Sequence, residues 1–159
     1  MLPQWQPPTN PDSHGVIHML AALPFPMRKE CPPGACVCGR DSLSLDPDGD
    51  VRILRLTLDE EKKLVARIDI IASYGDLTLL QERLYAQLGI ALKIAPRSRE
   101  VRTVRGFHIE LQERPGLCRK TRQAIPAAIR RCLERNPQIV YAILDAQDLF
   151  GAPGPVAPG

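Results

Sequence analysis

The chain has 159 residues, of which 44% are apolar and 25% are charged, and its formal net charge is +3. This length is enough for one domain whose core needs no disulfide framework, although the low aromatic content of 4% means that Leu, Ile, Val and Ala must fill that core. The apolar stretch at 16–25 is short and interrupted by prolines, which argues against a membrane span or a secretory signal. We therefore expect a cytoplasmic protein without a membrane partner, in a compartment that keeps thiols reduced.

The sixteen prolines are concentrated toward the two ends of the chain. Residues 1–27 are predicted to be a disordered Pro-rich leader, and residues 151–159 a disordered tail. Between them, residues 28–150 are predicted to form a single domain, which opens with a cysteine-rich loop at 28–41.

Two short alternating runs follow this loop, at 42–45 and 51–56, on either side of the turn sequence Asp-Pro-Asp-Gly-Asp. Pro47 fixes its own φ and Gly49 tolerates positive φ, so the pattern predicts a β-hairpin. A metal-binding loop that leads into a hairpin is typical of ribbon-like zinc modules. A hairpin without a metal is the alternative.

Two helices are predicted next. Thr57 and Glu60 fit a capping box, and the apolar face that follows them continues to about residue 73. A second helix is predicted from about Asp76 to Leu88, where Gly89 provides a C-terminal stop. The short joint between the helices predicts an antiparallel pair.

The rest of the domain is predicted to contain two strands and two helices. The strands lie at 90–95 and 101–111, and the helices cover about 119–135 and 137–149. Pro126 must lie in the first turn of the first of these helices or kink it. The chain thus predicts an α+β fold. Its small antiparallel sheet, made of the hairpin and two short strands, would be packed on one face by about four helices.

The strongest chemical signal is a group of three cysteines in the loop. Cys31, Cys36 and Cys38 fall within eight residues, on a backbone bent by prolines and glycines. Thiolates are the soft ligands that hold zinc or an iron–sulfur cluster, so the group predicts a metal site. The spacing is not the common paired C-x-x-C arrangement, and other uses of the thiols stay open.

A structural zinc site needs a fourth ligand. Cys118 is the first choice, because it lies in a loop just before a predicted helix and would cross-link the N-terminal loop to the body. His14 and His18 are the alternatives, both in the predicted leader. Cys132 lies on the apolar side of its helix and is predicted to be a core residue.

Two other hypotheses use the same cysteines differently. The chain could be a thiol-redox or iron–sulfur protein that uses Cys31, Cys36 and Cys38, with Cys36 and Cys38 close enough for a strained, easily reduced disulfide. It could also be a metal-free adaptor for protein interactions.

A second candidate site is basic. Residues 97–135 carry eleven bases and four acids, and ten of the bases are arginines, whose planar donor fork suits phosphate. If the loop and the helix start lie together, they would dock nucleic acid or a ribonucleoprotein; a solvated helix face is the alternative. The predicted anion-binding residues are Arg97, Arg99, Arg102, Arg105, Arg119, Lys120, Arg122, Arg130 and Arg131.

No catalytic residues are predicted. His108 and Glu110 alternate onto one face of a strand, but no nucleophile motif or phosphate-binding glycine loop accompanies them. Asp46, Asp48 and Asp50 do not match a calcium loop, because the glycine and the final glutamate are missing. The sequence therefore predicts a non-enzymatic protein with structural zinc and an arginine-rich surface.

Overall fold

The computed structural model describes residues 26–28, 31, 36–98 and 103–150. Most of the predicted leader and the whole predicted tail lie outside the described residues. In chain order the elements are α2 (Arg40–Leu45), the 3-10 turn η2 (Val51–Arg55), α3 (Leu58–Asp69), α4 (Tyr74–Leu88), β1 (Leu92–Pro96), the 3-10 turn η3 (Val104–Gly106), β2 (Phe107–Leu111), α5 (Arg119–Arg135) and α6 (Pro137–Phe150).

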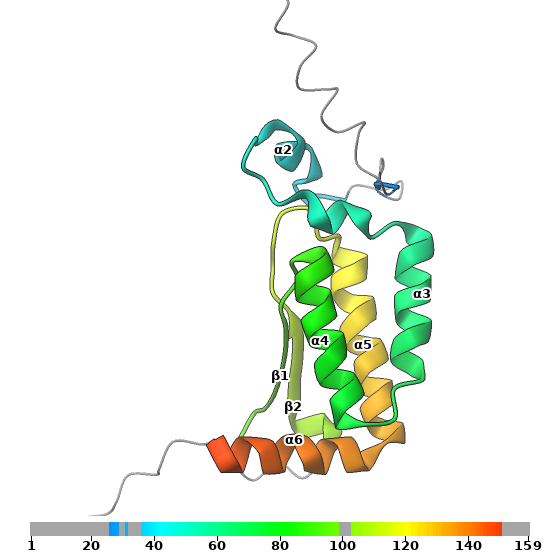
Figure 1. Ribbon diagram of the computed structural model, residues 1–159, viewed down its shortest axis with the longest axis vertical. Coiled ribbons are helices and arrows are strands. Elements are labelled where there is room, and N and C mark those ends of the chain that lie inside the picture. Colours follow the sequence, from blue (N-terminus) through cyan, green and yellow to red (C-terminus); the bar gives the residue numbers. More distant parts are fainter. Residues whose placement is uncertain (1–25, 29–30, 32–35, 99–102, 151–159) are drawn as a thin grey trace, which may run out of the picture.

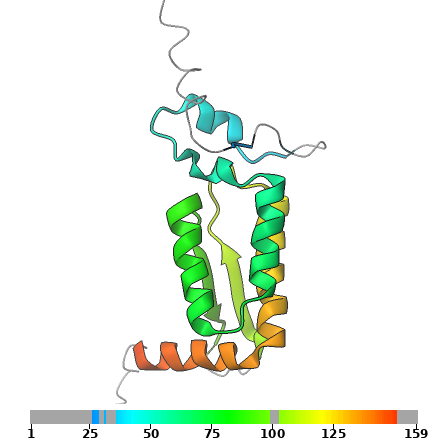
Figure 2. The ribbon, with the colours of Figure 1, turned by 45° about the vertical axis from the view of Figure 1, so that its right-hand side comes forward.

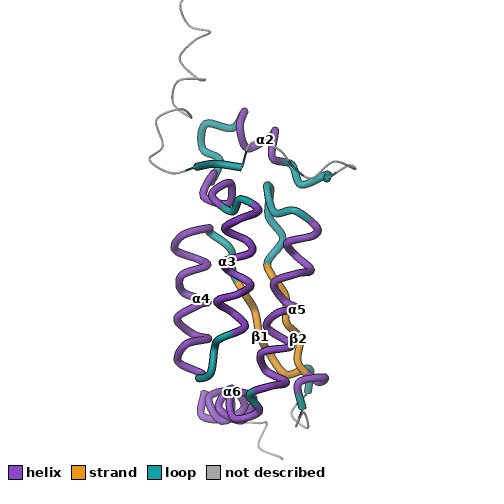
Figure 3. The backbone as a smooth tube through the Cα atoms, turned by 90° about the vertical axis from the view of Figure 1, so that its right-hand side faces the viewer, coloured by secondary structure: helices purple, strands orange, loops and turns teal. Residues whose placement is uncertain are grey.

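The α+β class is confirmed: α3, α4 and α5 stand beside a two-stranded sheet, and α6 lies across one end of them (Figures 1 and 3). The cysteine segment and α2 lie at the opposite end.

The hairpin predicted at 42–56 is wrong, because these residues form α2 and η2. The Asp50 carboxylate accepts a hydrogen bond of 3.1 Å from the backbone N–H of Arg52 and so caps the first turn of η2. Ile53 and Leu54 are both buried. Adjacent residues of a strand would point to opposite faces, whereas a tight helical turn directs both into the core.

The caps of α3 and α4 follow the sequence signals. The Thr57 hydroxyl accepts a hydrogen bond of 3.3 Å from the backbone N–H of Glu60, so the predicted start of α3 is confirmed. The Ser73 hydroxyl accepts a hydrogen bond of 3.1 Å from the backbone N–H of Asp76, and α4 therefore begins two residues earlier than predicted. Gly89, with a φ of 65°, ends α4 as expected.

The described sheet consists of β1 and β2, which pair antiparallel with Ile94 opposite Ile109. The burial of β2 alternates: Phe107 and Ile109 face the core, and His108 and Glu110 face outward. The predicted position of these two residues on one face of a strand is confirmed, and that face is exposed. The Nε2 atom of His108 lies 2.7 Å from a carboxylate oxygen of Glu110, and both side chains are about half exposed.

Helix α5 is central to the core and packs against α3 and β2. Its inner face includes Ile125, Ile129 and Cys132, all fully buried, which confirms Cys132 as a core residue. The Thr121 hydroxyl donates a hydrogen bond of 2.8 Å to the Glu61 carboxylate and joins α5 to α3. Within the described residues, no helix combines the length and apolar character required to cross a membrane.

Candidate metal centre

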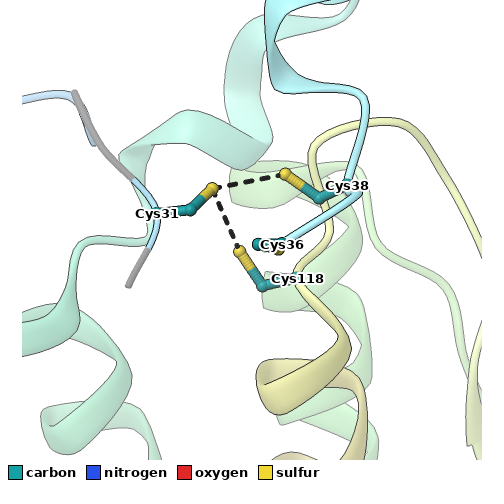
Figure 4. A group of neighbouring side chains, drawn as sticks. All are labelled: Cys31, Cys36, Cys38 and Cys118. Atoms are coloured by element: carbon teal, nitrogen blue, oxygen red, sulfur yellow. Dashed lines mark hydrogen bonds between the residues drawn. The ribbon is translucent and has the colours of Figure 1, made fainter. Parts of the chain in front are cut away.

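Four cysteines from separate parts of the chain meet at one end of the molecule. Their Sγ atoms all lie within 4.8 Å of one another. The Sγ of Cys31 is 3.4 Å from that of Cys38 and 3.8 Å from that of Cys118 (Figure 4). The structure therefore brings together the four cysteines named from the sequence: Cys31, Cys36, Cys38 and Cys118.

These distances suit one tetrahedral ion. Zinc–sulfur bonds of about 2.3 Å in a regular tetrahedron place the sulfurs about 3.8 Å apart. The two distances from Cys31 lie close to that value. Disulfide bonds are far shorter, about 2.05 Å, and all five cysteines are free. The group could hold a metal ion without a large movement of the chain.

Gly116 fixes the approach of the loop to α5. Its N–H donates a hydrogen bond of 2.6 Å to the carbonyl oxygen of Cys38, which places Cys38 beside the turn that carries Cys118. Its φ is 84°, and a Cβ atom here would lie 2.7 Å from side-chain atoms of Ile53 and Leu43. Only glycine fits this position, a requirement that the sequence analysis missed although the Pro-Gly pair signals a turn.

Arg28 holds the chain that leads to Cys31. Its backbone N–H donates a hydrogen bond of 2.7 Å to the carbonyl of Leu54, and its guanidinium donates to the carbonyl oxygen of Gly116. Met27 packs against the core beside it. Arg28 thus anchors the segment to the same turn that positions Cys38 and Cys118.

The environment gives three of the thiols different pKa values. Cys118 is 4% exposed, and burial raises the pKa of its thiol, as it does for Cys31. Burial also acts on Cys38, but hydrogen bonds from Cys31 and from the backbone of Arg40 outweigh it and lower the pKa of Cys38. Cys38 is therefore more ready to ionise than Cys31 or Cys118.

The predicted basic residues divide between two ends of the domain. Arg119 and Lys120 are exposed in the first turn of α5, next to the cysteines, and Arg122 is ion-paired with Glu113 in the same region. Arg119 and Lys120 thus form a small basic patch at the end of the domain where the cysteines lie.

The remaining basic residues lie elsewhere. Arg97 follows β1 and Arg105 precedes β2, at the end of the sheet opposite the start of α5 (Figure 1). Arg130 and Arg131 belong to the second half of α5. Arg97 and Arg105, the described basic residues of this loop, do not lie beside the start of α5, because the length of β2 separates them from it. Other predicted residues, Arg99, Arg102, His14 and His18, lie outside the described residues.

Comparison with known proteins finds no matching family model, curated protein or solved structure. The four-cysteine geometry is therefore the main guide to function.

Proposed function

We propose that Cys31, Cys36, Cys38 and Cys118 bind one Zn²⁺ ion, which fastens the N-terminal segment to the helical body of a non-enzymatic protein. The observation that carries this proposal is the meeting of four sulfurs within 4.8 Å. Four thiolates complete the tetrahedral coordination that zinc adopts in structural sites.

The composition of the site favours a structural role over a catalytic one. Catalytic zinc keeps one position for water or substrate, whereas here four protein sulfurs would fill every position. The segment that leads to Cys31 is held by the hydrogen bonds of Arg28 and by the packing of Met27 against the core. A bound ion would add a strong link between this segment and the start of α5.

The short separations also favour a single ion over a cluster. In a four-iron cluster each thiolate binds a different iron atom, so the ligand sulfurs stand farther apart than around one ion. The distance of 3.4 Å between the sulfurs of Cys31 and Cys38 fits one shared ion better.

The basic patch supplies a second part of the proposal. Arg119 and Lys120 are exposed at the N-terminal end of α5, where the helix dipole adds positive potential. We propose that this patch docks the phosphate backbone of nucleic acid, with the metal fixing the loop beside it. The affinity for duplex RNA or DNA should fall steeply with salt and with the double substitution Arg119→Ala and Lys120→Ala. The matched pair Arg97→Ala and Arg105→Ala should change it little, and an equal loss from both pairs would contradict the assignment.

Metal analysis tests the central proposal. Protein purified anaerobically and without tags should contain one zinc per chain, show no visible colour, and lose the zinc on Cys118→Ser substitution. Cys132→Ala is the matched control, because Cys132 lies in the core away from the site, and it should keep its zinc. A brown protein that contains iron and sulfide would show that the site holds an iron–sulfur cluster and not zinc. Metal-free protein with five free thiols would overturn the metal site altogether.

A further inference from the structure

A groove of about 550 Å³ runs between α3 and α4. The two helices lie side by side and are joined at one end, as Figure 2 shows. Both helices, Pro26 and the residues just before α3 line this groove, and half of the lining residues are aliphatic. Six of these aliphatic residues are buried or half-buried, namely Leu56, Leu64, Ile71, Leu80, Leu84 and Leu88.

Apolar side chains continue from the floor of the groove to its rim. Ile70 is 79% exposed and Leu79 is 42% exposed, and both line the groove. A single exposed aliphatic residue is ordinary, but two that extend a buried apolar surface indicate a surface that is covered in a complex.

Cations stand on both sides of this groove. Lys63 and Arg67 lie along α3, and Arg83 lies along α4. The acids there are engaged: Glu60 accepts a hydrogen bond of 2.7 Å from Lys63, and Asp76 accepts one of 2.7 Å from Ser73.

Arg67 and Arg83 have no ion-pair or hydrogen-bond partner among the described residues. A ligand that filled the apolar floor would therefore meet an uncompensated positive charge on each side. Charge complementarity selects a ligand with acidic groups on both edges of an apolar stripe.

We propose that the groove between α3 and α4 binds an amphipathic helix of a partner protein, with an apolar stripe on the floor and acidic residues facing Arg67 and Arg83. The length of α4, 15 residues, corresponds to roughly 22 Å, which accommodates about four turns of a bound helix. Anchors at i, i+3/i+4 and i+7 would enter between the two helices, as in other helix-in-groove complexes.

A charge-exchange experiment on the full chain tests this proposal. The probe is a fluorescein-labelled peptide of about 18 residues, with Leu at helical spacing and Glu on both sides of the stripe. A second peptide carries Lys in place of every Glu. Fluorescence anisotropy should show that the parent protein binds only the Glu peptide. The double variant Arg67→Glu with Arg83→Glu should bind the Glu peptide about tenfold or more weakly and should bind the Lys peptide more tightly than the parent does. Leu79→Asn should weaken binding of the Glu peptide without a change in charge, because it removes an apolar contact at the rim of the groove.

Lys93→Glu with Arg131→Glu provides a matched control, because both side chains are exposed away from the groove and the net charge changes equally. This variant should bind the Glu peptide nearly as the parent does. Equal affinity for the Glu and Lys peptides, or an equal loss in the control, would overturn the proposal. Tighter binding of the Glu peptide by the variant Leu20→Asp with Leu23→Asp would also overturn it, because the chain's own N-terminal segment would then be the occupant of the groove.

Discussion

Replacing Gly116 by alanine should lower the free energy of unfolding by about 2–5 kcal/mol. The φ of 84° is a left-handed conformation, which costs a residue with a Cβ atom roughly 1–2 kcal/mol. The added methyl group would lie 2.7 Å from the γ2 methyl of Ile53. Ile53 is fully buried and β-branched, so moving this methyl would force its χ1 out of the preferred rotamer within a packed core. Such overpacking costs about 1–3 kcal/mol more.

Urea unfolding followed by circular dichroism measures this loss, with zinc present in both samples. Gly75→Ala is the control, because a Cβ atom there would meet only the Ser73 hydroxyl at 3.9 Å and the residue lies exposed in α4. That change should be neutral or stabilise the protein by up to about 1 kcal/mol. A loss below about 1 kcal/mol for Gly116→Ala would refute the steric reasoning.

Three further outcomes are expected. Asp50→Asn should lower the free energy of unfolding by about 1 kcal/mol at pH 7, a value reduced for screening because the carboxylate is 33% exposed. Arg52 and Arg114 hold the pKa of Asp50 well below its usual range, so its contribution is present above about pH 4 and is lost on acidification. Urea midpoints of the parent and the variant should therefore converge below that pH, and a constant gap would contradict the assignment. Thr121→Val removes the hydrogen bond to Glu61 and should cost about 1–2 kcal/mol by the same assay, whereas an unchanged midpoint would show that the bond contributes nothing. Chelation of the metal removes a link between two cysteines that are 87 positions apart and should lower the free energy of unfolding by about 4–5 kcal/mol, measured as a lower urea midpoint. Identical midpoints with and without the chelator would count against a structural ion.

Much of the fold could be predicted because local signals agree with tertiary packing. Thr57 and Gly89 mark helix ends through hydrogen bonding and backbone geometry that depend on nearby residues alone. Cys118 could be identified as the fourth sulfur because three clustered cysteines leave one tetrahedral position open, and Cys132 carries the pattern of a core residue.

The failures have a different physical origin. The run at 51–56 is too short for periodicity to separate a strand from a tight helical turn, and the choice depends on the Asp50 cap and on the burial of both Ile53 and Leu54. The position of Arg97 and Arg105 depends on the direction of β2, which places them at the end of the sheet opposite the start of α5, and their part in anion binding stays a prediction. The groove between α3 and α4 depends on the separation of two helices, which no local pattern specifies.

The cysteine centre also determines how the domain would respond to mechanical load. Cys31 and Cys118 are 87 positions apart in the chain, yet their sulfurs lie 3.8 Å apart. With an ion bound, tension applied at the two ends would pass across the metal–thiolate bonds and bypass α3, α4 and the sheet. Of the elements that the structure describes, α5 and α6 would remain in line with the force. A stretched molecule would extend first by unravelling these two helices, and the rest would follow only when a metal–sulfur bond ruptures.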